Sequence, residues 1–500
     1  MTAELRAYQI EVIEKCREEI KVGNDKIIIV APTGSGKTIV AGSIIKSVVA
    51  KDKRALVLAH TREIIGQTSA KLAAEGIDHG IIQAGFAPRD AAVQIATVQT
   101  LSSRAMRSRR MELPAADLLI VDECQHSTAA TWRKIIESYP QAVLIGLTAT
   151  PCRGDGRGLG GIFDAIVECP QVAELIAQGY LVGTRVYAPA EPDLTGIRTR
   201  AGDYVEQELA QRMDKDELVG DIVQHYFKYG ERRKTVCFAV NVAHSIHICE
   251  EFKKAGVRAE HIDGSTPKPE RDAALARLAS GETEVVTNCM VLTEGWDLPA
   301  VACCILARPT KQMGLYRQMV GRVLRPAPGK TNAIVLDHAG ATYRHGFVED
   351  KVEWTLDPDR RAESKAHAAR QADGYRSRFV DCTSCGSIRV AGERCGHCGH
   401  LPQRRGDAVE FRDGDLALVG RKSRRAEMFS DPAERLRWYS MLAHIAEERG
   451  YKPGWASHKY KERFHTWPLQ RHPSLMEPTP EVLSWVRSRN IAWAKRKAAA

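Results

Sequence analysis

The feature that most constrains this chain is an apolar strand that runs straight into a glycine-rich turn. Residues 27–30 are four consecutive β-branched residues, a pattern typical of a strand buried on both faces. The turn that follows, residues 31–38, reads APTGSGKT, and an apolar helix is expected over residues 39–49. Strand, glycine-rich turn and helix in this order indicate a phosphate-binding loop. A chance glycine turn before a helix is the plain alternative.

The residue types in the loop suit the binding of a polyphosphate. Backbone N–H groups can converge on phosphate oxygens only where side chains leave room, which explains Gly34 and Gly36. Lys37 can reach the β and γ phosphates, and the Thr38 hydroxyl can ligate Mg²⁺. The predicted nucleotide-binding residues of the loop are Thr33, Gly34, Ser35, Gly36, Lys37 and Thr38.

Two polar residues stand just upstream of the loop. Arg6 and Gln9 open a helix that is expected to stop at Gly23. Their position before a nucleotide site would allow them to read an adenine edge. An ordinary helix surface is an equally good interpretation of the spacing.

An acidic pair, Asp122 and Glu123, follows the apolar run 118–121. Two carboxylates directly after a buried strand are costly unless a cation pairs with them, and Mg²⁺ bound to a polyphosphate supplies that partner. We expect Asp122 to hold the Mg²⁺ and Glu123 to orient or deprotonate the attacking water. Acidic residues also cap helices, so the pair alone is weak evidence for a Mg²⁺ site. Together with Lys37 of the phosphate-binding loop it becomes strong evidence.

Short apolar runs alternate with helical stretches along the first 190 residues, which is the rhythm of a parallel α/β sheet. Ligands bind at the carboxyl edge of such sheets. Polar residues at the ends of two of the expected strands are therefore candidates for nucleic-acid contact: Thr61, Arg62, Gln99 and Thr100. Thr148 and Thr150 end a further strand and can relay the state of the phosphate site.

The order of these motifs resembles the first lobe of a superfamily 2 helicase or translocase, the broad DEAD/DEAH-box class. The motifs are APTGSGKT, LAHTRE, TVQT, DECQH and TATP. The resemblance implies a second RecA-like lobe, ATP and Mg²⁺ as ligands, and nucleic acid bound across both lobes. Ala31 in place of the first loop glycine is a departure from the family pattern. Two further departures tilt the resemblance toward DNA: DECQH stands in place of DEAD, and motif VI begins with Gln318 instead of the His-Arg pair of the RNA-unwinding branch.

The second half carries motifs that resemble those of the second lobe. TEGWDLP, residues 293–299, is similar to motif V, and QMVGRVLR, residues 318–325, is similar to motif VI. The resemblance implies that Gly295 and Asp297 approach the nucleotide and that Gln318 belongs to the catalytic set. It also implies nucleic-acid contacts for Asn241, Gly264 and Thr293.

Arg322 and Arg325 are three residues apart, so on a helix both guanidinium groups would face one side. We expect them to enter the cleft from the second lobe as arginine fingers and to stabilise charge on the transferring phosphoryl group. A solvated basic helix face is the alternative. A site split in this way couples lobe motion to phosphate chemistry.

Four cysteines form a compact cluster near residue 390. Cys382 and Cys385, then Cys395 and Cys398, make two C-x₂-C pairs, each followed by glycine. Four thiolates at this spacing predict a structural Zn²⁺ site, which would supply folding energy to a segment too small for its own core. An iron centre, or a ligand from His397 or His400, is the minor alternative.

Most of the chain's net charge of +10 lies in the tail. Between residues 403 and 500 there are 20 Lys and Arg against 12 Asp and Glu, a surplus of eight. A basic surplus of this kind points to a polyanionic partner. Five of the eight tryptophans are also in the tail, and we expect most of them to form a small helical core. Stacking on unpaired bases, beside Lys and Arg that meet phosphates, is the alternative.

These expectations combine into an α/β protein of two tandem RecA-like domains, a zinc-binding module and a basic C-terminal helical module. The layout resembles RadD-type bacterial and phage DNA repair helicases. With neither an apolar run near 18 residues nor an N-terminal signal, and with scattered cysteines, the chain is expected in the cytoplasm without membrane contact. The expected boundaries are 1–190, 191–350, 351–380 (linker), 381–402 and 403–500.

The predicted function is an ATP-dependent DNA helicase or translocase, in repair, recombination or replication. DNA, single-stranded or branched, is the expected partner, with RNA as a second possibility and a single-strand-binding or recombination protein as a possible protein partner. The alternatives are an RNA helicase and a nucleotide-gated DNA-binding subunit of a restriction or defence complex.

Overall fold

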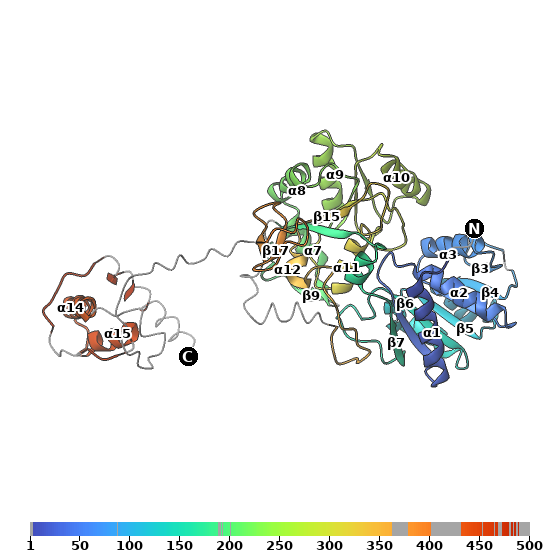
Figure 1. The fold of residues 1–500 in the computed structure, drawn as a ribbon, viewed down its shortest axis with the longest axis horizontal. Coiled ribbons are helices and arrows are strands. Elements are labelled where there is room, and N and C mark those ends of the chain that lie inside the picture. The colour runs from blue at the N-terminus through green and yellow to red at the C-terminus, as the bar shows by residue number, and fades with distance from the viewer. Residues whose placement is uncertain are drawn as a thin grey trace. The chain divides into compact units, whose positions relative to one another are not determined.

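The structure is a computed structural model, and it divides into two compact units, Met1–Arg405 and Gly406–Ala500, which are treated separately. It describes residues 4–362, 379–401 and 432–489, apart from 88, 189–191, 193, 201, 453, 465, 469–472, 480–481, 484 and 487–488. Within those residues, every helix is too short or too polar to cross a bilayer. The first unit holds two α/β lobes (Figure 1).

The first lobe is a seven-stranded parallel sheet in the order β3-β4-β2-β5-β6-β1-β7. The phosphate-loop strand β1 lies between β6 and β7, where Ile28 pairs with Gly146 on one side and Ile166 on the other. Its isoleucines are fully buried, as the sequence predicts. The strands are β1 (Lys26–Val30), β2 (Ala55–Ala59), β3 (Gly80–Ile82), β4 (Val93–Thr97), β5 (Leu118–Asp122), β6 (Val143–Thr148) and β7 (Ala165–Glu168).

Helices cover both faces of this sheet because successive strand residues point to opposite sides. Ile27 and Ile29 pack with α1, α2, α3 and α6, whereas Ile28 and Val30 pack with α4 and α5. The helices are α1 (Ala7–Lys21), α2 (Lys37–Val49), α3 (Arg62–Ala74), α4 (Val98–Leu101), α5 (Ala130–Glu137) and α6 (Val172–Ala177), with a π-helix η1 (Ser102–Arg107) and a 3₁₀ turn η2 (Cys124–Thr128).

The second lobe is a six-stranded parallel sheet in the order β12-β13-β11-β14-β15-β8. Helices α8 and α9 cover one face, and α10 and α11 the other. The elements are β8 (Gly183–Tyr187), β11 (Thr235–Phe238), β12 (Ala259–Ile262), β13 (Val285–Asn288), β14 (Cys303–Leu306) and β15 (Asn332–Asp337), the hairpin β9 (Thr199–Arg200) and β10 (Asp203–Tyr204), and α7 (Glu206–Met213), α8 (Asp216–Tyr229), α9 (Val242–Lys254), α10 (Lys268–Ser280), α11 (Met313–Gly321) and α12 (Ala341–His345).

The expected boundary at residue 190 is wrong, because β8 already belongs to the second lobe. Gly183–Tyr187 pairs with β15 at the edge of the second sheet, with Val186 opposite Val335. The chain therefore crosses between the lobes in the segment between β7 and β8.

The first part of the expected linker, residues 351–362, instead returns to the first lobe and packs on it. The Gln171 side chain exchanges two hydrogen bonds with the backbone of Val352, which is buried, and Gly160 N–H donates to the Leu356 carbonyl at 2.6 Å. Residues 363–378, the rest of the expected linker, lie outside the described residues.

The second unit contains α14 (Pro432–Glu448) and α15 (Trp455–Phe464). Trp438 is 5% exposed and meets Trp485 edge to face, with ring centroids 6.0 Å apart. Trp455 packs partly buried against the same core, whereas Trp467 is exposed and Trp493 lies outside the described residues. The expectation that most of these tryptophans build a small helical core is confirmed for the three that pack there.

Candidate nucleotide site between the two lobes

A cavity of about 480 Å³ opens between the lobes at the carboxyl ends of β1 and β5. The phosphate loop and the acidic pair form one wall, and the segments that follow β13 and α11 form the other. Twelve residues predicted from the sequence line it: Arg6, Thr33, Gly34, Gly36, Lys37, Thr38, Asp122, Glu123, Gly295, Asp297, Arg322 and Arg325. The structure therefore gathers into one cleft residues that are up to 319 positions apart in the chain.

The loop has the backbone that a phosphate cradle requires. Gly34 and Gly36 both have φ of +90°, a conformation that strains any residue with a Cβ. A Cβ on Gly36 would also lie 2.6 Å from Gln9 Nε2. Gly36 is the N-cap of α2, so the free N–H groups of that helix start at the cleft.

Gln9 is buried against the phosphate loop and does not lie on the helix surface. It is 1% exposed, its Nε2 donates to the Ser35 carbonyl at 3.1 Å, and its Oε1 accepts from Arg6 N at 2.9 Å. Tyr8 also donates to the Ser35 carbonyl, at 2.5 Å. The helix-surface alternative is thus wrong for Gln9, and its amide is engaged with the loop rather than directed at a base. Ser35 is buried at these contacts.

Arg6 does face the cleft, together with a residue that the sequence did not identify. Its guanidinium lies 4.3 Å from the centre of the Tyr180 ring. Both side chains line the cavity, and they place a cation and an aromatic ring where a base could stack.

The acidic pair carries more negative charge than its protein neighbours neutralise. Lys37 Nζ lies 3.0 Å from Glu123 Oε1, and Asp122 accepts from the Glu123 N–H at 3.0 Å. Burial, together with the charge of Glu123, raises the pKa of Asp122 to about 6. A divalent cation bound to the Asp122 carboxylate and the Thr38 hydroxyl would neutralise this negative charge. Oxygen ligands of this kind fit Mg²⁺.

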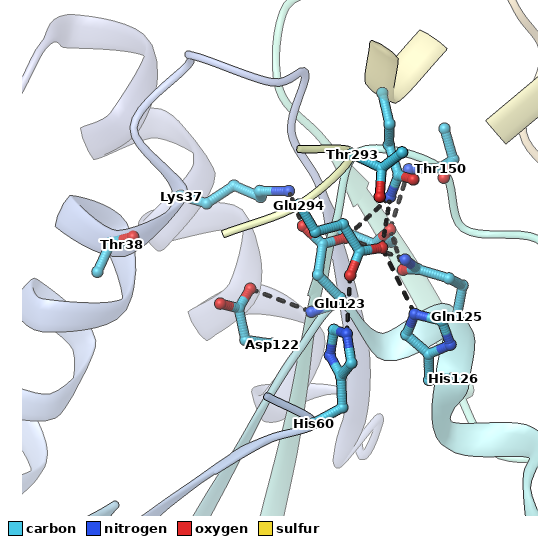
Figure 2. Close-up of polar contacts among 12 residues, drawn as sticks. Lys37, Thr38, His60, Asp122, Glu123, Gln125, His126, Thr150, Thr293 and Glu294 are labelled. Carbon is cyan, nitrogen blue, oxygen red and sulfur yellow. Dashed lines mark hydrogen bonds and ion pairs between the residues drawn. The ribbon is translucent and has the colours of Figure 1, made fainter. Parts of the chain in front are cut away.

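Glu123 is also bonded across the interlobe gap. Its Oε2 accepts from Gln125 Nε2 at 3.0 Å and lies 3.4 Å from Gln318 Nε2 of the second lobe. The Gln125 amide accepts in turn from Thr148 Oγ1 at 2.6 Å, and Thr148 accepts from the Thr150 N–H. Figure 2 shows Lys37 and Gln125 converging on Glu123. The polar chain links the acidic pair to the end of β6 and to the second lobe.

The predicted arginine pair faces the cleft, but it does not lie on one helix. Helix α11 ends at Gly321, so Arg322 follows its last residue and Arg325 lies in the irregular segment beyond the helix. The guanidinium of Arg322 donates to the Thr293 carbonyl at 2.7 and 2.9 Å and to the Trp296 carbonyl at 2.9 Å. Burial lowers its pKa to about 10, which still leaves it charged at neutral pH.

Arg325 lies directly against the phosphate loop. Its Cγ is 3.2 Å from the position that a Cβ on Gly34 would take, and its Nε is 3.0 Å from Asp297 Oδ1. A Cβ on Gly321 would lie only 2.7 Å from Thr33 Cβ. The two walls of the cleft therefore touch at glycines, and bulkier residues there would hold the lobes apart.

Motif V contributes a further direct contact between the lobes. Gln67 of α3 donates from Nε2 to the Gly295 carbonyl, and Gly295 has φ of +73°. Lys71, another residue of α3 that the sequence did not identify, reaches the cleft and donates to Thr38 Oγ1 at 3.4 Å. Desolvation in the cleft lowers the pKa of Lys71. Both residues lie on one face of α3, four positions apart.

The predicted nucleic-acid contacts are only partly brought together. Thr61 and Thr293 line one cavity of about 330 Å³, which also receives Lys268 and Arg271 from α10. Asn241 caps α9, since its Oδ1 accepts from the His244 N–H at 2.8 Å. Gln99 and Thr100 form part of the short helix α4, Gly264 is exposed in the turn after β12, and the Arg62 side chain lies outside the described residues. Asn241, Gln99, Thr100 and Gly264 are not among the residues that line the Thr61 cavity.

The four-cysteine cluster has the geometry of a metal centre. Cys382 Sγ lies 3.6 Å from Cys398 Sγ, and Cys385 Sγ lies 3.8 Å from Cys395 Sγ. Adjacent sulfurs around a tetrahedral Zn²⁺ with Zn–S bonds near 2.3 Å would be about 3.8 Å apart. His397 and His400 are not part of this cluster, and His400 Nε2 lies 3.1 Å from Thr383 Oγ1. Four thiolates thus suffice for a closed structural site.

The cysteine module packs on the second lobe. The hairpin β16 (Phe379–Asp381) and β17 (Ile388–Val390) carries the first cysteine pair. Phe379 meets the rings of Tyr343 and Phe347 at 5.6 and 5.5 Å, and Tyr187 OH lies 3.5 Å from the Cys385 carbonyl. The module is therefore built into the surface of this lobe.

Comparison with known proteins assigns the family. The family model described as "Type III restriction enzyme, res subunit" matches residues 2–153, and "Helicase conserved C-terminal domain" matches residues 214–327. A 51.5 kDa protein of Lactococcus phage (isolate 7-9) is 32% identical over 327 residues, which cover 65% of this chain and 68% of that protein. The chain belongs to the superfamily 2 helicases.

Further relatives of this superfamily 2 helicase agree with the assignment. The Saccharomyces cerevisiae protein named "Putative ATP-dependent helicase IRC3" is 30% identical, over 68% of this chain and 52% of that protein. The chain thus spans about half to two thirds of the length of these relatives. The solved structure of the ATP-dependent type ISP restriction-modification enzyme LlaBIII bound to DNA has the same fold, with a TM-score of 0.53 and 18% identity over 67% of this chain and 28% of that one. The two sheets described above are accordingly tandem RecA-like lobes.

Proposed function

We propose that this superfamily 2 helicase hydrolyses ATP in the cleft between its lobes and uses the lobe motion to translocate along or remodel DNA. The observation that carries the proposal is the split polar site. Glu123 of the first lobe meets Gln318 of the second, and Arg325 lies against the phosphate loop. Groups from both lobes are thus in place around one cavity large enough for a nucleotide.

The residues of the phosphate loop and the acidic pair would change partners when ATP binds. Lys37, now 3.0 Å from Glu123, would turn to the β and γ phosphates, which frees Glu123 to accept a proton from the attacking water. Thr38 and Asp122 would hold Mg²⁺, which would neutralise phosphate charge. Arg6 and Tyr180 would contact the base.

The second lobe would supply positive charge in the transition state. Arg325 needs only to exchange Asp297 for a phosphate oxygen, because it already lies beside Gly34. Arg322 would either leave the Thr293 and Trp296 carbonyls or remain there and fix motif V against the cleft. Loss of these contacts after hydrolysis would let the lobes separate, and repetition of the cycle would move the bound strand.

DNA is the nucleic acid along which we propose that the protein moves. A DNA-bound restriction-modification enzyme shares the fold, and the basic surplus of the tail suits a phosphate backbone. Within the first unit, the Thr61–Thr293 cavity with Lys268 and Arg271 is the proposed path of the strand. The proposal extends to a role in repair, recombination or replication, with a layout like that of the RadD-type helicases.

The deciding experiment is steady-state ATP turnover with single-stranded DNA, duplex DNA, forked DNA and RNA. The wild type is compared with Lys37→Ala and with Lys51→Ala, an exposed lysine just beyond α2 that serves as the control. The proposal expects stimulation by DNA, loss of turnover in Lys37→Ala and full activity in Lys51→Ala. Stimulation by RNA alone would support an RNA helicase instead.

A second candidate is a nucleotide-gated DNA-binding subunit of a restriction or defence complex. It is favoured by the family model named after a restriction subunit, which matches residues 2–153. The same experiment separates the two, because such a subunit would bind DNA in an ATP-dependent manner without turnover on any nucleic acid.

A further inference from the structure

A cluster of two histidines and a carboxylate bridges the lobes beside the nucleotide cleft. His60 follows β2 and His126 lies in η2, both in the first lobe, while Glu294 follows β13 in the second. His60 Nε2 lies 2.8 Å from Glu294 Oε2, and His126 Nε2 lies 3.5 Å from Glu294 Oε1. Figure 2 shows both imidazoles directed at the one carboxylate. The residues are far apart in sequence, so their meeting depends entirely on the fold.

We propose that His60, His126 and Glu294 form a site for a divalent transition metal, with Zn²⁺ as its natural probe. Two ligand atoms bound about 2.0–2.1 Å from a tetrahedral ion lie about 3.3 Å apart, and the distances of 2.8 and 3.5 Å bracket this value. The three ligand atoms all lie within 4.8 Å of one another. Imidazole nitrogen with carboxylate oxygen suits Zn²⁺, Cu²⁺ or Ni²⁺ better than Mg²⁺.

The surroundings of the cluster favour an ion as well. Gln318 Nε2 lies 3.2 Å from Glu294 Oε1 and so orients the carboxylate from outside the site. His60 presents Nε2 to the Glu294 carboxylate, so Nε2 is the nitrogen placed to bind the ion. His126 and Glu294 also line two cavities, of about 330 and 770 Å³, through which an ion and a water ligand can enter.

An ion at this site would link the lobes. Its ligands come from both lobes, so opening of the cleft would require at least one metal bond to break. If the lobes cycle as in the proposed function, on which this consequence rests, bound Zn²⁺ would arrest turnover with the cleft closed. The acidic pair need not lose its Mg²⁺ for this to happen, because the two sites share no ligand.

Metal binding is tested on the full chain with its cysteine cluster kept loaded with zinc. Co²⁺ is titrated into wild type, His126→Ala and His60→Ala, and d–d absorption without a thiolate charge-transfer band reports a nitrogen and oxygen site. His247→Ala is the matched control, since His247 Nδ1 lies 2.7 Å from Asp214 Oδ1 and lies outside the two possible metal clusters of the described residues. We expect one bound Co²⁺ in wild type and control, and affinity at least about tenfold weaker in both variants. If His126→Ala does not fold, His126→Asn takes its place, and its unfolding temperature is measured to confirm that it is folded.

Equal Co²⁺ binding by wild type and the folded His126 and His60 variants would overturn the site. Zn²⁺ inhibition of DNA-stimulated ATP turnover, measured at a fixed excess of Mg²⁺–ATP, then tests the bridge: we expect His126→Ala to need at least about tenfold more Zn²⁺. Equal inhibition of wild type and His126→Ala would overturn the bridge. Because Co²⁺ absorption does not depend on turnover, a chain that binds Co²⁺ but hydrolyses no ATP would refute the proposed function and leave the metal site standing.

Discussion

Gln318 Nε2 lies 3.4 Å from Glu123 Oε2, and the two residues belong to different lobes. The same amide lies 3.2 Å from Glu294 Oε1, so one side chain of α11 touches both the acidic pair and motif V. A movement of the second lobe would therefore change the contacts of Glu123, the carboxylate proposed to activate water. The coupling of chemistry to motion would depend on this contact.

Replacement of Gln318 by Ala should impair hydrolysis more than nucleotide binding. The variant keeps the phosphate loop and Lys37 but loses the contact that places Glu123 relative to the second lobe. We expect kcat to fall about tenfold to a hundredfold with KM for ATP changed less than about threefold. Gln178→Ala, at an exposed position after α6, is the control and should keep wild-type kinetics. A rise in KM alone would show that Gln318 serves binding only.

Replacement of Gly321 by Ala should hold the lobes apart. The added Cβ would lie 2.7 Å from Thr33 Cβ, closer than side-chain atoms pack. We expect ATP turnover to fall at least about tenfold, with little change in the unfolding temperature, because the clash can be relieved by opening the cleft. Gly220→Ala is the matched control, since a Cβ there meets nothing within 4 Å and Ala favours the helix by up to about 1 kcal/mol. Undiminished turnover in Gly321→Ala would mean that the closed contact is not part of the cycle.

Stability should fall in mild acid because of a buried histidine in the second lobe. Burial, with the His225 ring centroid 5.1 Å away, lowers the pKa of His338 to about 3, whereas an unfolded imidazole titrates near 6.5. As the pH falls, the unfolded chain therefore binds the proton before the folded chain does. The contribution of His338 to the free energy of unfolding is fully present above about pH 6.5 and is lost as the pH falls toward 3.

The check is chemical unfolding at pH 7 and pH 5 on wild type and His338→Phe. The histidine contributes up to about 1.4 kcal/mol of destabilisation for each pH unit in this window, so the variant should lose less stability on acidification. His458→Phe, at an exposed position of the second unit, should behave like wild type. If wild type and His338→Phe lost the same amount of stability between pH 7 and pH 5, His338 would not be the source of the acid destabilisation.

Removal of the metal from the cysteine module should destabilise the second lobe and not only the module. Phe379 packs on Tyr343 and Phe347, and Tyr187 lies at the Cys385 carbonyl, so collapse of the hairpin uncovers that surface. We expect Cys395→Ser to abolish tight zinc binding and to lower the unfolding temperature by about 2–4 °C for each kcal/mol lost. Cys289→Ser, at a half-buried cysteine outside the cluster, should retain zinc. Full zinc content in Cys395→Ser would refute the four-thiolate site.

Much of the nucleotide site follows from the sequence because its residues sit in short motifs with fixed chemistry. Lys37, Asp122 and Arg325 were each recognisable from a few neighbours, and the fold gathers them around one cleft. The four-cysteine cluster was predictable for the same reason, since both cysteine pairs are local. Strand β1 was predictable from its run of β-branched residues.

The features that were missed depend on contacts between distant segments. Nothing in residues 183–187 indicates that they pair with β15 rather than with the first sheet, and the apolar residues of 351–362 do not show which lobe they cover. The three-residue spacing of Arg322 and Arg325 does not show that helix α11 ends at Gly321, where the chain lies against Thr33 of the phosphate loop. The His60, His126 and Glu294 cluster has no local pattern at all.

The most direct test of a catalytic site shared by two lobes is single-turnover ATP hydrolysis by Arg325→Ala with saturating DNA. Arg232→Ala, an exposed arginine of the second lobe, is the control. We predict that Arg325→Ala binds ATP within about threefold of wild type but hydrolyses it about 10²- to 10³-fold more slowly, while Arg232→Ala hydrolyses it normally. Hydrolysis by Arg325→Ala at the wild-type rate would contradict the account, because the chemistry would then need nothing from the second lobe.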